Sequence, residues 1–199
     1  MKWIVVGLGN PGEEYVHTRH NAGRRAVEAF AEHIGCTPFS PDNAVKRDVA
    51  KGSVGSDIVV AILPNTFMNK SGSAVKDMVT TTKAAERLVV AYDDIDLPFG
   101  ALKISFGRGS GGHKGIESIV RAVKTKDFVR VRIGVAPVTP SGKIKKPMGE
   151  QKVHDHLLGV FTKREEEKLP TLFGRVRAAI ESIIADGRAQ AMNTFNQNA

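Results

Sequence analysis

Two polar segments of the chain carry residue types suited to acid–base chemistry. Residues 7–21, GLGNPGEEYVHTRHN, follow an apolar run and include Asn10 and His20. Residues 92–100, YDDIDLPFG, follow another apolar run and include Asp93. Histidine titrates near neutral pH and can take a proton from water, while a carboxylate bonded to its ring fixes the tautomer and stabilises the charged form. No serine lies in a G-x-S-x-G elbow, so a His–Asp pair acting on water fits these residues better than a covalent nucleophile.

A glycine-rich segment, GRGSGGHKG at residues 107–115, precedes an apolar helical pattern and favours anion binding. Its five glycines let backbone N–H groups approach a ligand, and the N-terminus of the following helix adds partial positive charge. Arg108, His113 and Lys114 supply further donors. The segment does not match the Walker pattern G-x-x-x-x-G-K-[ST], so a Walker phosphate loop is excluded here. A flexible structural link is the alternative interpretation.

Neither an organic cofactor nor a metal is predicted from these segments. The opening segment spells G-x-G-x-x-G, but a dinucleotide loop needs a helix to begin at the third glycine. Two glutamates follow that glycine instead, and the first helical pattern begins only near residue 21. A nicotinamide- or flavin-dependent enzyme is thus an alternative that cofactor absorbance would reveal. Asp93, Asp94 and Asp96 match no calcium-loop spacing.

The rest of the pattern predicts the elements that must hold these segments. Apolar runs predict buried strands at Ile4–Val6, Ile58–Leu63, Leu88–Ala91 and Val129–Val135. Helical patterns are expected after a cap at Asn21, over Ser71–Val79, over Ile116–Val123, after a Thr162 capping box, and from Pro170 to Gly187. Strands that alternate with helices favour an α/β fold. We predict a single three-layer domain over residues 1–199, with a mostly parallel mixed central sheet flanked by helices and a mobile basic loop at about 137–152.

The charge of the chain is concentrated in one quarter of its length. The 199 residues carry a net charge of +8, and residues 103–152 hold twelve Lys and Arg against three acids. This asymmetry favours a polyanionic partner, nucleic acid ahead of an acidic membrane surface, with a solvated basic face as the alternative. Cys36 is the only cysteine, and no apolar run approaches the ~20 residues of a membrane span. We therefore expect a soluble cytoplasmic protein.

Several longer motifs resemble those of one known family. They are GLGNPGEEYVHTRHNAG, NTFMNKSGSAV, YDDIDLPFG with GGHKGIESI, and AMNTFN towards the end of the chain. In content and order they resemble bacterial-type peptidyl-tRNA hydrolase over nearly the whole chain. The resemblance implies an enzyme that hydrolyses the ester joining a peptide to the terminal ribose of tRNA, which recycles the tRNA. It also implies a monomer that needs no organic cofactor.

The resemblance also implies roles for individual residues. His20 matches the catalytic base, Asp93 the acid that stabilises it, and Asn10 the residue that separates blocked from free aminoacyl ends. Substrate contacts are expected at Tyr15, Phe67, Met68, Asn69, His113 and Lys114. Acceptor-stem phosphates are expected to contact Lys103, Arg108, Arg132 and the lysines of residues 143–146. Simple surface charge is the alternative at each of these basic positions.

Two positions depart from the family pattern. Lys114 stands where the family usually has asparagine, and lysine donates hydrogen bonds but cannot accept them. Ser105 stands where relatives often carry another phosphate-binding lysine. Lys114 keeps open an alternative from another class, a noncatalytic RNA-binding relative such as the intron-splicing factors of plants. The presence of both His20 and Asp93 favours catalysis.

Overall fold

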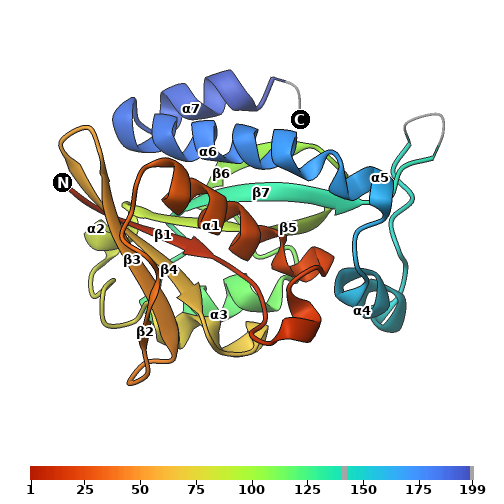
Figure 1. Ribbon diagram of the computed structural model, residues 1–199, viewed down its shortest axis with the longest axis horizontal. Coiled ribbons are helices and arrows are strands. Elements are labelled where there is room, and N and C mark those ends of the chain that lie inside the picture. Colours follow the sequence, from red (N-terminus) through yellow and green to blue (C-terminus); the bar gives the residue numbers. More distant parts are fainter. Residues whose placement is uncertain (140–142, 198–199) are drawn as a thin grey trace.

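A seven-stranded mixed sheet forms the centre of the molecule (Figure 1). The computed structural model describes residues 1–139 and 143–197. The strands are β1 (Lys2–Gly7), β2 (Ser40–Asp42), β3 (Arg47–Val54), β4 (Asp57–Pro64), β5 (Leu88–Pro98), β6 (Leu102–Phe106) and β7 (Val129–Ala136). Their order is β2-β3-β4-β1-β5-β7-β6, with parallel pairing from β4 through β1 and β5 to β7 and antiparallel pairing elsewhere. The mixed central sheet predicted from the sequence is therefore confirmed, with parallel pairing along the four consecutive strands β4, β1, β5 and β7.

The four predicted apolar runs form the four parallel strands. Helices cover both faces of these strands, so side chains pointing either way are buried and the sequence reads as a continuous apolar run. The sequence does not predict β2, β3 and β6. These strands lie towards the two ends of the sheet. β2 has no buried residue, β3 mixes buried, half-buried and exposed residues, and β6 has polar Lys103 and Ser105 between its apolar residues, so none of them gives a continuous apolar run.

Helices flank the sheet on both faces, which confirms the three-layer α/β domain (Figure 1). One face packs against α1 (Ala22–His33), α6 (Leu169–Ala185) and α7 (Arg188–Phe195). The other packs against the 3-10 helix η3 (Met68–Ala74), α2 (Thr82–Ala85) and α3 (Lys114–Val123). The remaining helices are η1 (Glu13–Tyr15), η2 (Arg19–Asn21), α4 (Glu150–Leu158) and α5 (Lys163–Glu166). Among the residues described, no helix combines the length and apolar character needed to cross a membrane.

The predicted helix signals in the C-terminal region are confirmed. Thr162 and Glu165 form a capping box at the start of α5, each side chain bonding the backbone of the other. Pro170 lies in the first turn of α6, where its missing N–H leaves no hydrogen bond unmade. Gly187 follows the end of α6 with a φ of 88°, a left-handed conformation that glycine adopts without strain.

The α-helix predicted over Ser71–Val79 is instead the 3-10 helix η3 followed by turns. Ser71 and Ser73 donate their hydroxyls to carbonyls three residues back, which competes with the four-residue hydrogen bonds of an α-helix. Gly72 lies so close to α3 that a Cβ there would be 2.2 Å from the carbonyl oxygen of Ser118. The contact between η3 and α3 therefore depends on direct approach of the two backbones.

The basic loop predicted at residues 137–152 is shorter than expected, because α4 already begins at Glu150. Within it, Val138 and Ile144 form an isolated antiparallel bridge. Residues 140–142 lie outside the described residues, so the mobility of the loop stays a prediction.

Candidate active site

The candidate active site lies where β1 ends and β5 continues. β1 pairs with β5 as far as Gly7 and Ala91. β5 runs on to Pro98 and remains paired with β7 at Asp93. The helix η2, which carries His20, packs against β5 just beyond the end of β1. The apolar run Leu88–Ala91 predicts that Asp93 directly follows a strand, whereas Asp93 lies inside β5 but past the end of the neighbouring strand β1.

His20 and Asp93 form a close pair in the site. Nδ1 of His20 lies 3.0 Å from both Oδ1 and Oδ2 of Asp93. Asp93 is 2% exposed, and the side chain of His20 is 14% exposed. A carboxylate can only accept, so Nδ1–H of the neutral imidazole donates to it and Nε2 keeps its lone pair. The geometry therefore prepares Nε2 to accept a proton from water.

His113 contacts the same carboxylate. Its Nε2 lies 3.2 Å from Oδ1 of Asp93, and its Nδ1 accepts from the backbone N–H groups of Gly115 at 3.1 Å and Ile116 at 3.3 Å. These backbone donors require a lone pair on Nδ1, so the ring proton is on Nε2 and is donated to Asp93. The resemblance implied a substrate contact for His113, and the structure adds a contact with the Asp93 carboxylate and a cap on α3.

Burial and the surrounding charges act in opposite directions on the pKa values of the pair. Burial raises the pKa of the Asp93 carboxyl, but the charges and hydrogen bonds of His20 and His113 lower it well below its ordinary value. Burial lowers the pKa of His20, but the charge and hydrogen bond of Asp93 raise it by more, to above the ordinary value of 6.5. The positive charge of Lys114 opposes that rise to a smaller extent. Asp93 is therefore an anion near neutral pH, and His20 is a stronger base than free imidazole.

Asn10 is held by three hydrogen bonds in the loop after β1. Its backbone N–H donates to Oδ1 of Asn21 over 2.8 Å, and its carbonyl accepts from Nδ2 of Asn21 over 2.9 Å. Its side-chain Oδ1 accepts from the backbone N–H of Met68 over 2.9 Å. Asn21 therefore does not cap α1 with its side chain, as the sequence predicts, because that amide is bonded to Asn10. No described residue accepts from Nδ2 of Asn10, so this side chain offers a ligand a donor.

The other predicted substrate contacts lie at two different depths. Phe67 is 58% exposed and forms an edge-to-face pair with Tyr15, with ring centroids 6.4 Å apart. Asn69 is also exposed and lines the same groove as Phe67. Met68 is buried in the core, where its backbone N–H holds Asn10. Phe67 and Asn69 can reach a ligand directly, whereas the side chain of Met68 supports the site from within.

The predicted phosphate-binding residues Lys103, Arg108 and Arg132 line one cavity of about 550 Å³ at the β6–β7 end of the sheet. Arg130 lines it as well and was not singled out from the sequence, although alternation along β7 puts Arg130 and Arg132 on one face. Arg130 is fully buried, and its Nε and Nη2 have no hydrogen-bond partner among the described residues. Nε of Arg132 donates to Oδ2 of Asp94 over 2.7 Å, so one side of that guanidinium is already paired.

The two departures from the family pattern lie in different surroundings. Ser105 is buried in the wall of this cavity opposite Arg130, and its hydroxyl has no partner within the described structure. Lys114 begins α3 with a side chain that is 67% exposed, and its Nζ lies 3.6 Å from Oε1 of Glu150. A contact between such exposed groups contributes little to stability, so Lys114 is free to exchange it for a ligand.

The acids considered as metal ligands from the sequence do not converge. Asp93 faces the histidines, Asp94 accepts from Arg132, and Asp96 pairs with Lys146 of the basic loop. A different set does meet, because donor atoms of His20, Asp93 and His113 lie within 4.8 Å of one another. Two imidazoles and a carboxylate suit Zn²⁺. The ring nitrogens that face Asp93 carry protons, however, and would have to lose them before they could bind a metal.

The fold and the site define an α/β protein with a buried His–Asp pair beside a basic surface. The sequence model of the family described as peptidyl-tRNA hydrolase matches residues 4–199. The peptidyl-tRNA hydrolase of Chloroflexus aurantiacus is 42% identical over 196 residues, with 98% of both chains covered. That of Bdellovibrio bacteriovorus is 40% identical over 196 residues, covering 98% of this chain and 99% of the relative.

A solved structure agrees with these relatives. The crystal structure of peptidyl-tRNA hydrolase from Acinetobacter baumannii has a TM-score of 0.86 to this chain at 31% identity, covering 98% of this chain and 95% of the other. The chain belongs to the peptidyl-tRNA hydrolase family, which confirms the resemblance seen in the sequence motifs.

Proposed function

We propose that the chain hydrolyses the ester bond of peptidyl-tRNA with His20 as general base and Asp93 as the group that orients it. Membership of the family supports the reaction. The observation that carries the residue assignment is the contact of His20 Nδ1 with Asp93, because it leaves Nε2 as the acceptor for a proton of water. The raised pKa of His20 fits this role.

The reaction divides into two proton transfers at His20. Nε2 takes a proton from water while the water oxygen attacks the ester carbonyl carbon, and the imidazolium that forms is stabilised by Asp93. When the tetrahedral intermediate breaks down, the bond to the ribose oxygen breaks and the imidazolium returns its proton to that oxygen. The products are free tRNA and a peptide that ends in a carboxyl group.

Asn10 is proposed to help separate blocked from unblocked substrates. Its Oδ1 is bonded to the Met68 N–H, so its Nδ2 is the group that can meet a peptide carbonyl. An N-blocked substrate supplies such a carbonyl, whereas the ammonium of an ordinary aminoacyl-tRNA supplies only donors. Placing a donor against a donor disfavours the unblocked substrate.

The tRNA arm of the substrate is proposed to lie over the cavity of Lys103, Arg108 and Arg132, where phosphates would find several cations. Contacts of Tyr15 and Asn69 with the substrate belong to the same proposal. We further propose that the chain acts as a monomer in the cytoplasm, as the sequence motifs imply for the family.

The test is release of free tRNA from an N-acetylated and an unblocked aminoacyl-tRNA. We expect the wild type to cleave only the acetylated substrate and His20→Ala to lose that activity. His33→Ala is the matched control, since this exposed histidine ends α1 and pairs with Glu181 away from the site. Full activity of His20→Ala would exclude His20 as the base.

The alternative, a noncatalytic RNA-binding relative, predicts a different outcome of the same experiment. Neither substrate would be cleaved, yet the wild type would still bind tRNA. Lys114→Asn would then be the first substitution to make, because Lys114 is the residue of the site that departs from the family pattern.

A further inference from the structure

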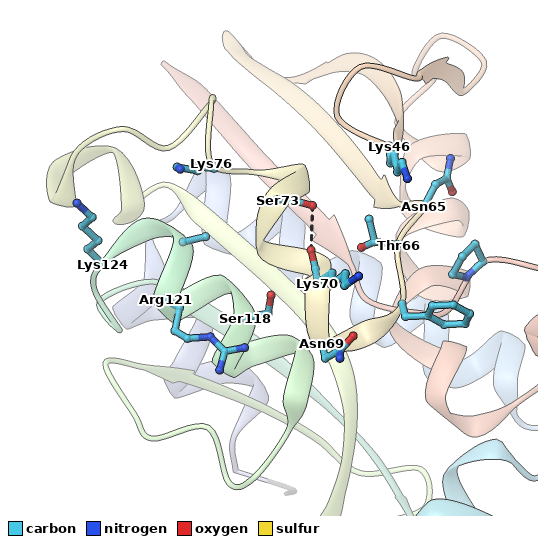
Figure 2. Close-up of a pocket in the computed structure, with 13 residues that line it drawn as sticks. Lys46, Asn65, Thr66, Asn69, Lys70, Ser73, Lys76, Ser118, Arg121 and Lys124 are labelled. Carbon is cyan, nitrogen blue, oxygen red and sulfur yellow. Dashed lines mark hydrogen bonds between the residues drawn. The ribbon is translucent and has the colours of Figure 1, made fainter.

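A basic groove extends from the substrate contact proposed at Asn69 to residues that have no role in the proposed reaction (Figure 2). Its volume is about 830 Å³, within the roughly 300–1,000 Å³ of ligand sites. Among the described residues that line it there are five cations and no acid. The cations are Lys46, Lys70, Lys76, Arg121 and Lys124.

The charge of this groove is not compensated within the protein. All five cations are exposed, and none forms an ion pair in the part of the chain that the structure describes. The acid next in sequence to Lys76 is Asp77, which is already paired with Arg47 over 2.7 Å. Elsewhere, several basic side chains are matched to carboxylates, as Arg25 is to Glu166. A cluster of unpaired cations gives the groove a positive potential that attracts an anionic ligand.

The groove begins beside the catalytic residues and leads away from the cavity proposed for tRNA. At this end the groove is lined by Pro11, which follows Asn10 in the chain, and by Phe67, which precedes Met68. The backbone N–H of Met68 in turn donates to Asn10. It continues along η3 to the outer side of α3 (Figure 2). In the sheet, β1 and β5 lie between β4, which leads into the groove, and β7 and β6, which carry the cavity.

This arrangement matches the two arms of the substrate, tRNA and peptide, which are joined at the ester. The tRNA arm is the larger polyanion. The cavity is lined by Lys103, Arg108, Arg130 and Arg132, and the basic loop that follows β7 adds Lys143, Lys145 and Lys146. With tRNA on that side, the groove is left for the peptide. Asn65, Thr66 and Asn69 give it amide and hydroxyl groups that can bond a peptide backbone of any sequence.

We propose that the groove binds the peptide part of the substrate and favours peptides with acidic side chains. This inference rests on the proposed function, and specifically on the placing of tRNA at the other side of the site. The backbone contacts keep the site general, and the uncompensated cations add a preference by charge. Each ion pair between an exposed cation of the groove and an acidic side chain of the peptide should raise kcat/KM by about 1.5- to fivefold. This effect should decrease as salt is added.

The experiment compares kcat/KM for one tRNA carrying N-acetylated peptides of equal length, one rich in aspartate and glutamate and one rich in lysine. We expect the wild type to prefer the acidic peptide. The double variant Lys70→Glu with Arg121→Glu should reverse this preference, and Lys70→Gln with Arg121→Gln should reduce it. The control Lys51→Glu changes an exposed lysine of β3 outside the groove and should leave the ratio as in the wild type.

Other outcomes would overturn the proposal. An acidic-to-basic ratio that is the same in wild type and double variant would show that the groove does not contact the peptide. An equal loss on both substrates, together with weaker binding of deacylated tRNA, would assign the groove to nucleic acid. If the wild type cleaved neither substrate, the proposed function itself would fail, and it would be recognised by that result before any variant was compared.

Discussion

His113 Nε2 lies 3.2 Å from the Asp93 oxygen that also contacts His20. Because the other ring nitrogen of His113 accepts from the backbone N–H groups of Gly115 and Ile116 in the first turn of α3, this histidine links the carboxylate to the start of a helix. The carboxylate is thus held by two imidazoles from segments far apart in the sequence. These contacts fix its orientation towards His20.

Replacing Asp93 by Asn should abolish most of the activity. The amide could donate to Nδ1 of His20, which would move the ring proton to Nε2 and remove the base. We expect kcat to fall by roughly 10³–10⁴-fold, as for comparable His–Asp pairs, with little change in KM. Asp96→Asn is the matched control, since Asp96 faces Lys146 and not His20. A loss below about tenfold would mean that Asp93 does not orient the base.

His113 can be tested for two roles at once. In His113→Asn the side-chain oxygen can still cap α3, while the contact with Asp93 is lost; in His113→Ala both are lost. We expect kcat to fall roughly tenfold or more in both variants, the value of one hydrogen bond to a charged group. Only the Ala variant should also lose the helix cap, which should lower its free energy of unfolding by a further ~0.5–2 kcal/mol. Thermal unfolding measures this difference. Equal stability of both variants would argue against the cap.

The pH dependence of the reaction should report His20. Burial lowers the pKa of His20 and Asp93 raises it by more, so it lies above 6.5. Only the neutral ring accepts a proton, so kcat/KM should fall as the pH decreases through this raised pKa. In Asp93→Asn the negative charge that raises the pKa of His20 is gone, while the burial that lowers this pKa remains. The inflection of the residual activity should therefore move to lower pH. An inflection at the same pH in both proteins would assign it to another group.

A methyl group at Gly72 should destabilise the fold. A Cβ there would lie 2.2 Å from the carbonyl oxygen of Ser118, so η3 and α3 would have to separate. We expect Gly72→Ala to lose about 1–3 kcal/mol in urea unfolding. The control is Gly174→Ala inside α6, where the nearest atom to a new Cβ is the flexible Arg177 Nη2 at 3.7 Å. The free energy of unfolding of that variant should rise by roughly 0.5–1 kcal/mol. A similar decrease in this free energy for both variants would refute the packing argument.

Arg108→Gln should weaken tRNA binding without changing the chemistry of ester cleavage. Arg108 is exposed and lines the cavity proposed for phosphates. Loss of one phosphate contact should reduce the slope of log affinity against log salt concentration by about one, whatever the tRNA sequence. Arg164→Gln, an exposed arginine of α5, is the control. Identical salt slopes for both variants would place the tRNA elsewhere.

The sequence predicted the centre of the fold because burial on both faces makes β1, β4, β5 and β7 read as apolar runs. β3 mixes buried, half-buried and exposed residues, many of them polar, and so carried no such run. The helix expected from Ser71 was wrong because the serine hydroxyls bond backbone carbonyls, a local contact that hydrophobic periodicity does not contain.

For the site, residue types indicated the chemistry but not the contacts. His20 and Asp93 are 73 positions apart, and their pairing was expected only from the family resemblance. The bond between Asn21 and Asn10 could not be predicted, since Asn21 also looked like a helix cap. Arg130 was visible in the alternation of β7, but only the structure shows that it faces the same cavity as Arg132.

The early end of β1 has a consequence for how the site excludes water. In parallel sheets, ligands ordinarily bind at the rim beyond the ends of the strands, where solvent is close. Here β1 stops at Gly7 while β5 continues, so Asp93 lies inside the sheet and is 2% exposed. The protein itself therefore shields the anion that stabilises the charged imidazole from water and holds it in place. In these surroundings the carboxylate stabilises the imidazolium more strongly than it would in water.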